Sequence, residues 1–154
     1  FTTSNGPRVN LAGQLILVFF LGKERYALDA RQVLRVIPAV PCRPLPQAPA
    51  YVVGLLNFEG RQVAVLDLCQ LCLGRPCEPI MSTRILLVPY QETMLGVMVE
   101  SLIETARYSM EAFAPTGIAG PPFLGGVQSV PEGTVQLLKV TDLFSDEVKA
   151  LLSP

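Results

Sequence analysis

The sequence predicts an all-β protein in which two small barrels pack over a shared core. Short apolar or alternating runs, separated by glycine- and proline-containing turns, follow one another from Gln14 onward, as in small all-β domains. The order of these runs repeats once along the chain. Of the 154 residues, 50% are hydrophobic and only 16% are charged, which is too little charge to cover the whole surface. We therefore expect part of the surface to be buried against another protein.

The first half of the chain contains five predicted strands. They are rich in β-branched and aromatic residues, which favour strands, and they cover residues 15–21, 25–29, 33–37, 51–57 and 62–68. Five prolines between Pro38 and Pro49 exclude both a helix and an interior strand from that stretch, so we expect an extended connection on the surface. Short helical turns are expected at residues 30–32 and 68–73.

The second half repeats this plan with strands at residues 84–88, 94–99, 102–107, 123–127 and 135–140. Equivalent positions lie 71 to 75 residues apart; they are Asp29 and Glu100, Gly54 and Gly126, Glu59-Gly60 and Glu132-Gly133, and Asp67-Leu68 and Asp142-Leu143. Each half is too small to hold much core alone, so the halves should pack together as paired barrels. The expected organisation is a tail at 1–13, a domain at 14–145 with approximate halves 14–80 and 81–145, and a C-terminal helix or tail at 146–154, beginning after an N-cap at Ser145.

Charge and segment length exclude several classes of protein. The formal net charge is −1 and the basic residues do not cluster, so neither nucleic acid nor anionic lipid is an expected partner. The longest apolar run, residues 15–21, is far shorter than the ~20 residues that cross a bilayer. The first residues resemble no secretory signal, and a cytoplasmic location is expected.

The reactive side chains argue against an enzyme. The chain has no histidine, the commonest general base and a frequent metal ligand, and we expect neither catalysis nor a cofactor. Cys69-x-x-Cys72 has a spacing found in zinc and redox sites, but a zinc site would need Cys77 and the distant Cys42 as its second pair. We expect no metal, with Cys72 as a small core residue and the other thiols free.

Several segments together resemble the CheW-like domain of bacterial chemosensory systems. They lie at residues 19–29, 45–60, 65–68, 83–88, 95–100 and 123–127. The most specific pattern combines Pro-x-Ala-Pro, Gly-x-x-Asn-x-x-Gly and Asp-Leu between Pro46 and Leu68. The resemblance covers about residues 14–145. It implies two five-stranded barrels of the Src-homology type that share a hydrophobic core.

The resemblance also implies a non-catalytic adaptor. Members of this family bridge the cytoplasmic tip of methyl-accepting chemoreceptors, a helical hairpin, to the regulatory domain of the histidine kinase CheA, within membrane-associated receptor arrays. The receptor tip docks in a groove between the barrels, and the kinase contacts the outer surface of one barrel. The positions implied for receptor contact are Val33, Arg35, Val36, Gly54, Asn57, Glu59, Gly60, Arg84, Gly96 and Leu102.

Most of these positions also have a purely structural interpretation. Val33 and Val36 could belong to the core. Gly54 and Gly60 could be required by backbone geometry, and Asn57 could form a turn through its side-chain amide.

One departure from the family pattern concerns charge. The family usually carries Asn-Leu-Arg-Gly at the hairpin and Glu at the position of Arg35, whereas this hairpin reads Asn57-Phe58-Glu59-Gly60. Both charges are therefore reversed. We predict a cross-strand ion pair between Arg35 and Glu59, which would contribute about 0 to 1 kcal/mol of stability and act mainly on the choice of partner. The alternative is that the two residues are unrelated solvated charges.

Alternative interpretations remain at this point. Residues 24–30 and 73–76 are similar to adaptors of Wsp-type surface-sensing pathways. The chain could also be a CheW-like regulatory part of a larger CheA- or CheV-type protein. From a different class, the cysteines could form a metal- or redox-responsive switch.

Overall fold

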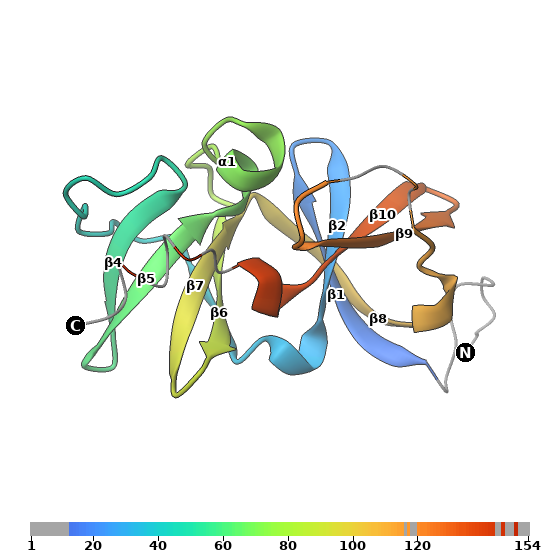
Figure 1. The fold of residues 1–154 in the computed structure, drawn as a ribbon, viewed down its shortest axis with the longest axis horizontal. Helices are drawn as coiled ribbons and strands as arrows, with labels where there is room; N and C mark the ends of the chain where they lie inside the picture. Colours follow the sequence, from blue (N-terminus) through green and yellow to red (C-terminus); the bar gives the residue numbers. More distant parts are fainter. Residues whose placement is uncertain (1–12, 116, 118–119, 144–145, 147–149, 151–154) are drawn as a thin grey trace.

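The computed structural model describes residues 13–115, 117, 120–143, 146 and 150, and within these ranges ten strands form two five-stranded sheets (Figure 1). The terminal barrel contains strands from both ends of the described chain: β1 (Gln14–Leu21), β2 (Glu24–Asp29), β8 (Ser101–Tyr108), β9 (Leu124–Val130) and β10 (Gly133–Leu138). The central barrel contains β3 (Arg35–Pro38), β4 (Val52–Phe58), β5 (Arg61–Asp67), β6 (Arg84–Tyr90) and β7 (Thr93–Val99). The prediction of an all-β fold with two small barrels is confirmed.

The two halves of the chain exchange strands. The strand orders are β8-β1-β2-β10-β9 and β3-β6-β7-β5-β4, so each barrel takes a hairpin from one half and three strands from the other. Parallel pairing occurs only where β2 meets β10 and β5 meets β7, and the other paired strands are antiparallel. The predicted repeat of five strands is present, but the halves 14–80 and 81–145 do not correspond to the two barrels.

Three apolar clusters hold the barrels together. One fills each barrel, and the largest lies between them. The side chains of strand β1 alternate between two clusters. Ile16 and Val18 pack inside the terminal barrel, whereas Leu17 and Phe19 pack in the shared cluster. Because such strands are buried on both faces, their sequences are almost continuously apolar. Much of the apolar excess noted in the composition is therefore internal.

Helical structure is limited to short segments. Helix α1 (Leu68–Leu73) lies at the top of Figure 1, beside the junction of the barrels. Asp67 caps it by accepting a hydrogen bond from the Gln70 amide at 3.2 Å. Turns of 3-10 helix occupy Ala30–Gln32, Met110–Ala112 and Val140–Leu143. The helical turns predicted at 30–32 and 68–73 are confirmed.

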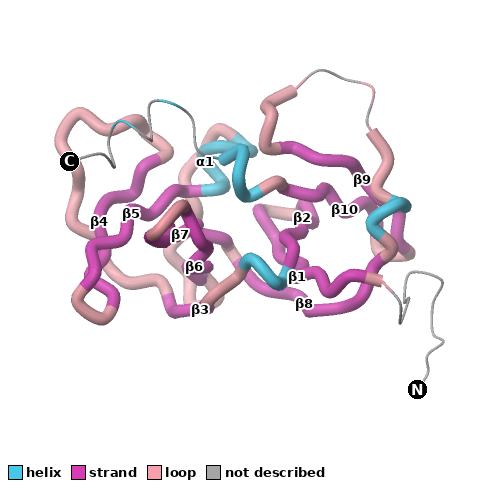
Figure 2. Tube along the Cα trace, turned by 60° about the horizontal axis from the view of Figure 1, so that its bottom comes forward, coloured by secondary structure: helices cyan, strands magenta, loops and turns pink. Residues whose placement is uncertain are grey.

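The connection from β3 to β4 is extended, as predicted. Figure 2 shows it as a long loop at the end of the central barrel. Its Arg43 exchanges two backbone hydrogen bonds of 2.8 Å with Leu55 of β4. Strand β3 begins two residues later than predicted because Val33 closes the preceding 3-10 turn. It includes Pro38, which an edge strand tolerates.

Two predicted features lie outside the described residues. These are most of the N-terminal tail at 1–13 and the C-terminal helix at 148–152, apart from single positions. Among the residues that are described, no helix is long and apolar enough to cross a membrane.

Candidate binding surface on the central barrel

The predicted ion pair between Arg35 and Glu59 is present. The Arg35 Nη2 and Glu59 Oε2 atoms are 3.5 Å apart, and both side chains are largely exposed. The guanidinium also lies over the Phe58 ring, 5.3 Å from its centroid. Because β3 and β4 are at opposite edges of the strand order, the pair joins the two edges of the central barrel. It is not a contact between hydrogen-bonded neighbours.

The turn that carries Glu59 has two consecutive residues with positive φ. Glu59 and Gly60 have φ values of 51° and 84°, the left-handed pair required by a two-residue hairpin of type I′. The Gly60 amide donates to Asn57 Oδ1 at 3.0 Å. A Cβ atom on Gly60 would meet nothing within 4 Å, so φ alone explains the glycine. The structural interpretations of Asn57 and Gly60 therefore hold, while both remain exposed beside Glu59.

Two of the implied contact residues are buried. A Cβ atom on Gly54, whose φ is 149°, would overlap the carbonyl oxygen of Arg43. A Cβ atom on Gly96 would lie 2.9 Å from Ile85 Cγ2 and 3.1 Å from Val65 Cγ2 inside the central barrel. Neither glycine is exposed to a partner. Both glycines serve close packing, and the receptor contact expected at these two positions remains a prediction.

The remaining implied residues divide by exposure. Val33 and Leu102 are half-buried and pack against the cluster between the barrels. Arg84 is half-buried, and its Nη1 donates to the carbonyl oxygens of Met81 and Thr83 at 2.6 and 3.0 Å. Val36 is 38% exposed, so its assignment to the core is not supported.

Exposed apolar side chains follow one face of β3 and its extensions. We call this set the β3 strip; it consists of Leu34, Val36, Pro38 and Val40. These residues alternate along extended backbone and therefore share a face. Val36 pairs with Leu86 of β6, which belongs to the cluster between the barrels. The strip therefore lies on the side of the sheet that faces the junction.

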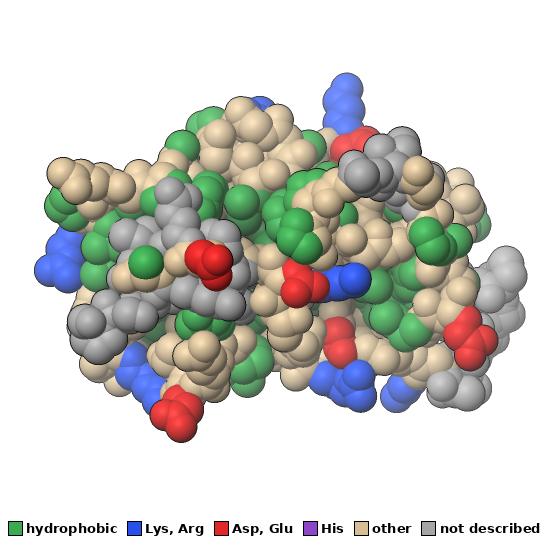
Figure 3. Space-filling view, viewed as in Figure 1, with side chains coloured by type: hydrophobic (Ala, Val, Ile, Leu, Met, Phe, Trp, Pro, Cys, Tyr) green, Lys and Arg blue, Asp and Glu red, His purple; other side chains and the backbone are tan. Residues whose placement is uncertain are grey.

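The loop before β6 adds to this apolar surface. Ile80 is 51% exposed and Met81 is 96% exposed. The Ala39 amide donates to the Thr83 carbonyl at 3.3 Å, which places the end of the β3 strip beside this loop. Sequence reasoning missed Ile80 and Met81, although an apolar pair between Pro79 and Ser82 was a visible signal. On the face shown in Figure 3, acidic and basic side chains are interspersed, and neither sign forms a large patch.

A buried carboxylate joins the two barrels next to this surface. Glu100 accepts hydrogen bonds from the Gly22 amide at 2.6 Å, the Glu78 amide at 2.8 Å and Arg75 Nη1 at 2.8 Å. The Arg75 guanidinium, with these amides, lowers the pKa of Glu100 from 4.5 to about 2. Gly22 lies in the turn between β1 and β2. The charged carboxylate therefore holds the terminal barrel against the loop that follows α1.

Residues 15–148 match the family described as the CheW-like domain. The chain belongs to this family. Similar proteins include the chemotaxis protein CheW of Rhizobium meliloti, 22% identical over 149 residues and covering 94% of this chain and 96% of the relative. The chemotaxis protein CheW of Treponema pallidum is 27% identical over 143 residues, covering 86% of this chain and 82% of the relative.

A solved structure has the same fold as this CheW-like chain. It is the scaffolding protein TtCheW from Thermoanaerobacter tengcongensis, with a TM-score of 0.79 and 24% identity over 91% of this chain and 98% of that one. The expected family and fold are confirmed. Membership of the CheW-like family supports a role for this protein as a chemotaxis scaffold.

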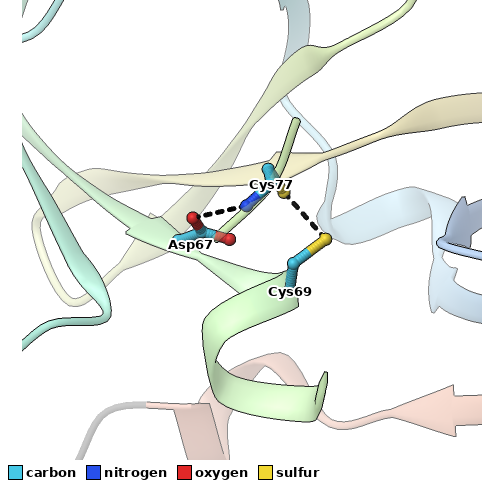
Figure 4. Close-up of side chains that lie close together, drawn as sticks. All are labelled: Asp67, Cys69 and Cys77. Atoms are coloured by element: carbon cyan, nitrogen blue, oxygen red, sulfur yellow. Dashed lines mark hydrogen bonds between the residues drawn. The ribbon is translucent and has the colours of Figure 1, made fainter. Parts of the chain in front are cut away.

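The cysteines of the CheW-like chain assemble differently from the zinc site considered above. Cys69 Sγ lies 3.0 Å from Cys77 Sγ, whereas Cys42 packs against the core inside the central barrel. Ligand atoms of Asp67, Cys69 and Cys77 all lie within 4.8 Å of one another (Figure 4). Among the described residues, this is the group with the donor types and spacing to hold a metal ion.

Proposed function

We propose that this CheW-like protein is a non-catalytic adaptor that couples the cytoplasmic tip of a methyl-accepting chemoreceptor to the regulatory domain of a CheA-type histidine kinase. It acts in the cytoplasm, at membrane-associated receptor arrays. The observation that carries the proposal is the β3 strip, an exposed apolar row on an edge strand at the junction of the barrels. The names of the chemotaxis relatives support the same role.

The chemistry of the strip suits a helical partner. A helix that docks in a groove places its apolar face on apolar floor residues and keeps its charged residues at the rim. Leu34, Val36 and Val40 are 53%, 38% and 39% exposed, and they provide such a floor together with Ile80 and Met81. Arg35 and Glu59 provide charge at the rim.

The ion pair at the rim acts on partner choice. An exposed pair contributes little to stability, about 0 to 1 kcal/mol, yet a rim charge selects among partners by attraction and repulsion. The reversed order of charges in Arg35 and Glu59 presents a different field from the usual family pattern. The receptor tip that binds this protein is expected to carry the complementary arrangement.

The test is binding of the purified full chain to a receptor-tip hairpin and to a CheA regulatory domain from the same cell, measured by calorimetry. The variant Val36→Asp places a charge in the strip and should weaken receptor binding at least tenfold. Leu15→Asp is the matched control, because Leu15 is 37% exposed and Val36 is 38% exposed, yet Leu15 lies on the terminal barrel. Circular dichroism verifies the fold of both variants.

Three results would contradict the proposal. The wild-type chain could bind neither partner. Val36→Asp could bind the receptor tip as tightly as the wild type. Alternatively, Leu15→Asp could lose as much affinity as Val36→Asp, which would place the receptor elsewhere.

A further inference from the structure

Two free thiols face each other beside helix α1. Cys69 is buried at the start of α1, and Cys77 is partly exposed in the following loop. Their sulfur atoms are 3.0 Å apart, with the Cys77 thiol donating to Cys69 Sγ. Figure 4 shows both sulfurs pointing toward one another. No function described above uses this pair.

The surrounding hydrogen bonds hold the two thiols in place. Asp67 Oδ1 accepts from the Gln70 amide at 3.2 Å and fixes the start of α1, while Oδ2 accepts from the Cys77 amide at 2.9 Å. On either side of Cys77, Arg75 and the Glu78 amide bind Glu100. Both the helix that carries Cys69 and the loop that carries Cys77 are therefore anchored. Bringing the two sulfurs together requires little reorganisation.

The geometry favours a covalent bond over a metal ion. A disulfide has an S–S length of about 2.05 Å, so the sulfurs need to approach by roughly 1 Å. A tetrahedral zinc ion with Zn–S bonds of about 2.3 Å holds its sulfurs roughly 3.8 Å apart, so the pair would have to separate. Both carboxylate oxygens of Asp67 already accept backbone hydrogen bonds.

We propose that Cys69 and Cys77 are a reversible oxidation site at which hydroperoxides form an intramolecular disulfide. The more exposed Cys77 sulfur, as its thiolate, attacks one oxygen of hydrogen peroxide; the O–O bond breaks, and the departing hydroxide takes up the proton that the Cys77 thiol released, giving water and a sulfenic acid. Cys69 Sγ then attacks the Cys77 sulfur, the S–S bond forms, and the S–O bond breaks to release a second water that carries the Cys69 proton. Two thiols are oxidised and one hydrogen peroxide is reduced to two waters. A dithiol reductant reverses the reaction by thiol–disulfide exchange.

The disulfide would change the loop beside the β3 strip. It would fasten α1 to the loop over residues 74–83, which carries the exposed Ile80 and Met81. The hydrogen bond to Cys69 and burial raise the pKa of Cys77, so little reactive thiolate is present at neutral pH. Cys77 therefore reacts slowly with peroxide at neutral pH. This inference does not depend on the proposed adaptor function.

The experiment treats the reduced full chain with hydrogen peroxide and measures intact mass before and after dithiothreitol. The expected result is a loss of two hydrogen atoms that dithiothreitol restores. Trypsin leaves the three cysteines in one peptide because Pro76 follows Arg75. Chymotrypsin, which cleaves after Leu71 and Leu73, separates them and should yield a crosslink between Cys69 and Cys77.

Matched variants make the assignment specific. Cys77→Ser should abolish the mass loss, and Cys72→Ser, a change in the same helix, should leave it intact. Thermal melting verifies that both variants fold. A crosslink between Cys69 and Cys72, no mass loss in the wild type, or a stoichiometric zinc ion that protects the thiols would each overturn the proposal.

Discussion

The two barrels share one strand plan but differ in the chemistry of their edge strands. In the central barrel, β3 exposes the apolar β3 strip and carries Arg35. In the terminal barrel, the equivalent edge strand β8 exposes Ile103 together with the polar Glu104, Thr105 and Arg107. The backbone scaffold is therefore duplicated, whereas a continuous row of exposed apolar side chains is present on β3 and absent from β8. Under the proposed adaptor function, the exposed side chains of the edge strand determine which barrel binds the receptor.

The largest expected effect concerns the glycines that hold each barrel closed. Gly54→Ala should destabilise the protein by about 3 kcal/mol, because both φ and the Arg43 carbonyl forbid a Cβ atom. Its equivalent Gly126→Ala meets the Ala114 carbonyl oxygen at 2.7 Å but needs no positive φ, so a smaller loss is expected. Gly60→Ala, in open space with φ of 84°, should cost about 1 kcal/mol.

Urea denaturation followed by circular dichroism gives these three values. Equal losses at Gly54 and Gly126 would show that the two barrels tolerate strain alike. A loss at Gly60 as large as that at Gly54 would contradict the packing argument.

The next effect concerns the joint between the barrels. The pKa of Glu100 is lowered from 4.5 to about 2 by Arg75 and the backbone amides, so its charged form stabilises the folded state. This contribution, at most about 3 kcal/mol, is complete above pH ~4.5 and is lost as the pH falls toward 2. Glu100→Gln should lower the unfolding free energy at pH 7 and flatten its pH dependence in that window.

Glu78→Gln is the control for this joint, because Glu78 contributes its backbone amide to the Glu100 carboxylate. It should keep the pH dependence of the wild type. A wild-type unfolding free energy that does not change between pH 5 and pH 2.5 would contradict the assigned role of Glu100.

Much of the fold was predictable from local patterns. The two-residue turn at Glu59-Gly60, the extended proline-rich connection and the helix at 68–73 all follow from residue chemistry within a few positions. The exchange of strands between halves was not predictable, because the parallel contacts of β2 with β10 and of β5 with β7 join distant segments and leave no local signature.

The candidate site was predictable only in part. The ion pair of Arg35 and Glu59 followed from opposite charges at two positions of the family pattern. The packing role of Gly96 was not predictable, because a sequence does not distinguish a glycine that admits a partner from one that admits a neighbouring strand. The contact of Cys69 with Cys77 depends on how the loop folds back over α1, which spacing alone does not specify.

The smallest expected effect on stability concerns the charges at the rim. Exchanging both charges, with Arg35→Glu and Glu59→Arg, should change the unfolding free energy by less than about 1 kcal/mol. The same exchange should alter the preference between the cognate receptor tip and a tip from a system with the usual family charges, measured as a ratio of dissociation constants. An unchanged ratio would show that the two charges have no part in partner choice.

The central claim is that the edge of the central barrel, and not that of the terminal barrel, receives the receptor. Amide hydrogen exchange of the full chain, with and without a receptor-tip hairpin, tests it most directly. The account predicts slower exchange at residues 34–40 and 80–84 and no change in β8. Protection confined to β8, or none in either edge strand while the hairpin is bound, would contradict it.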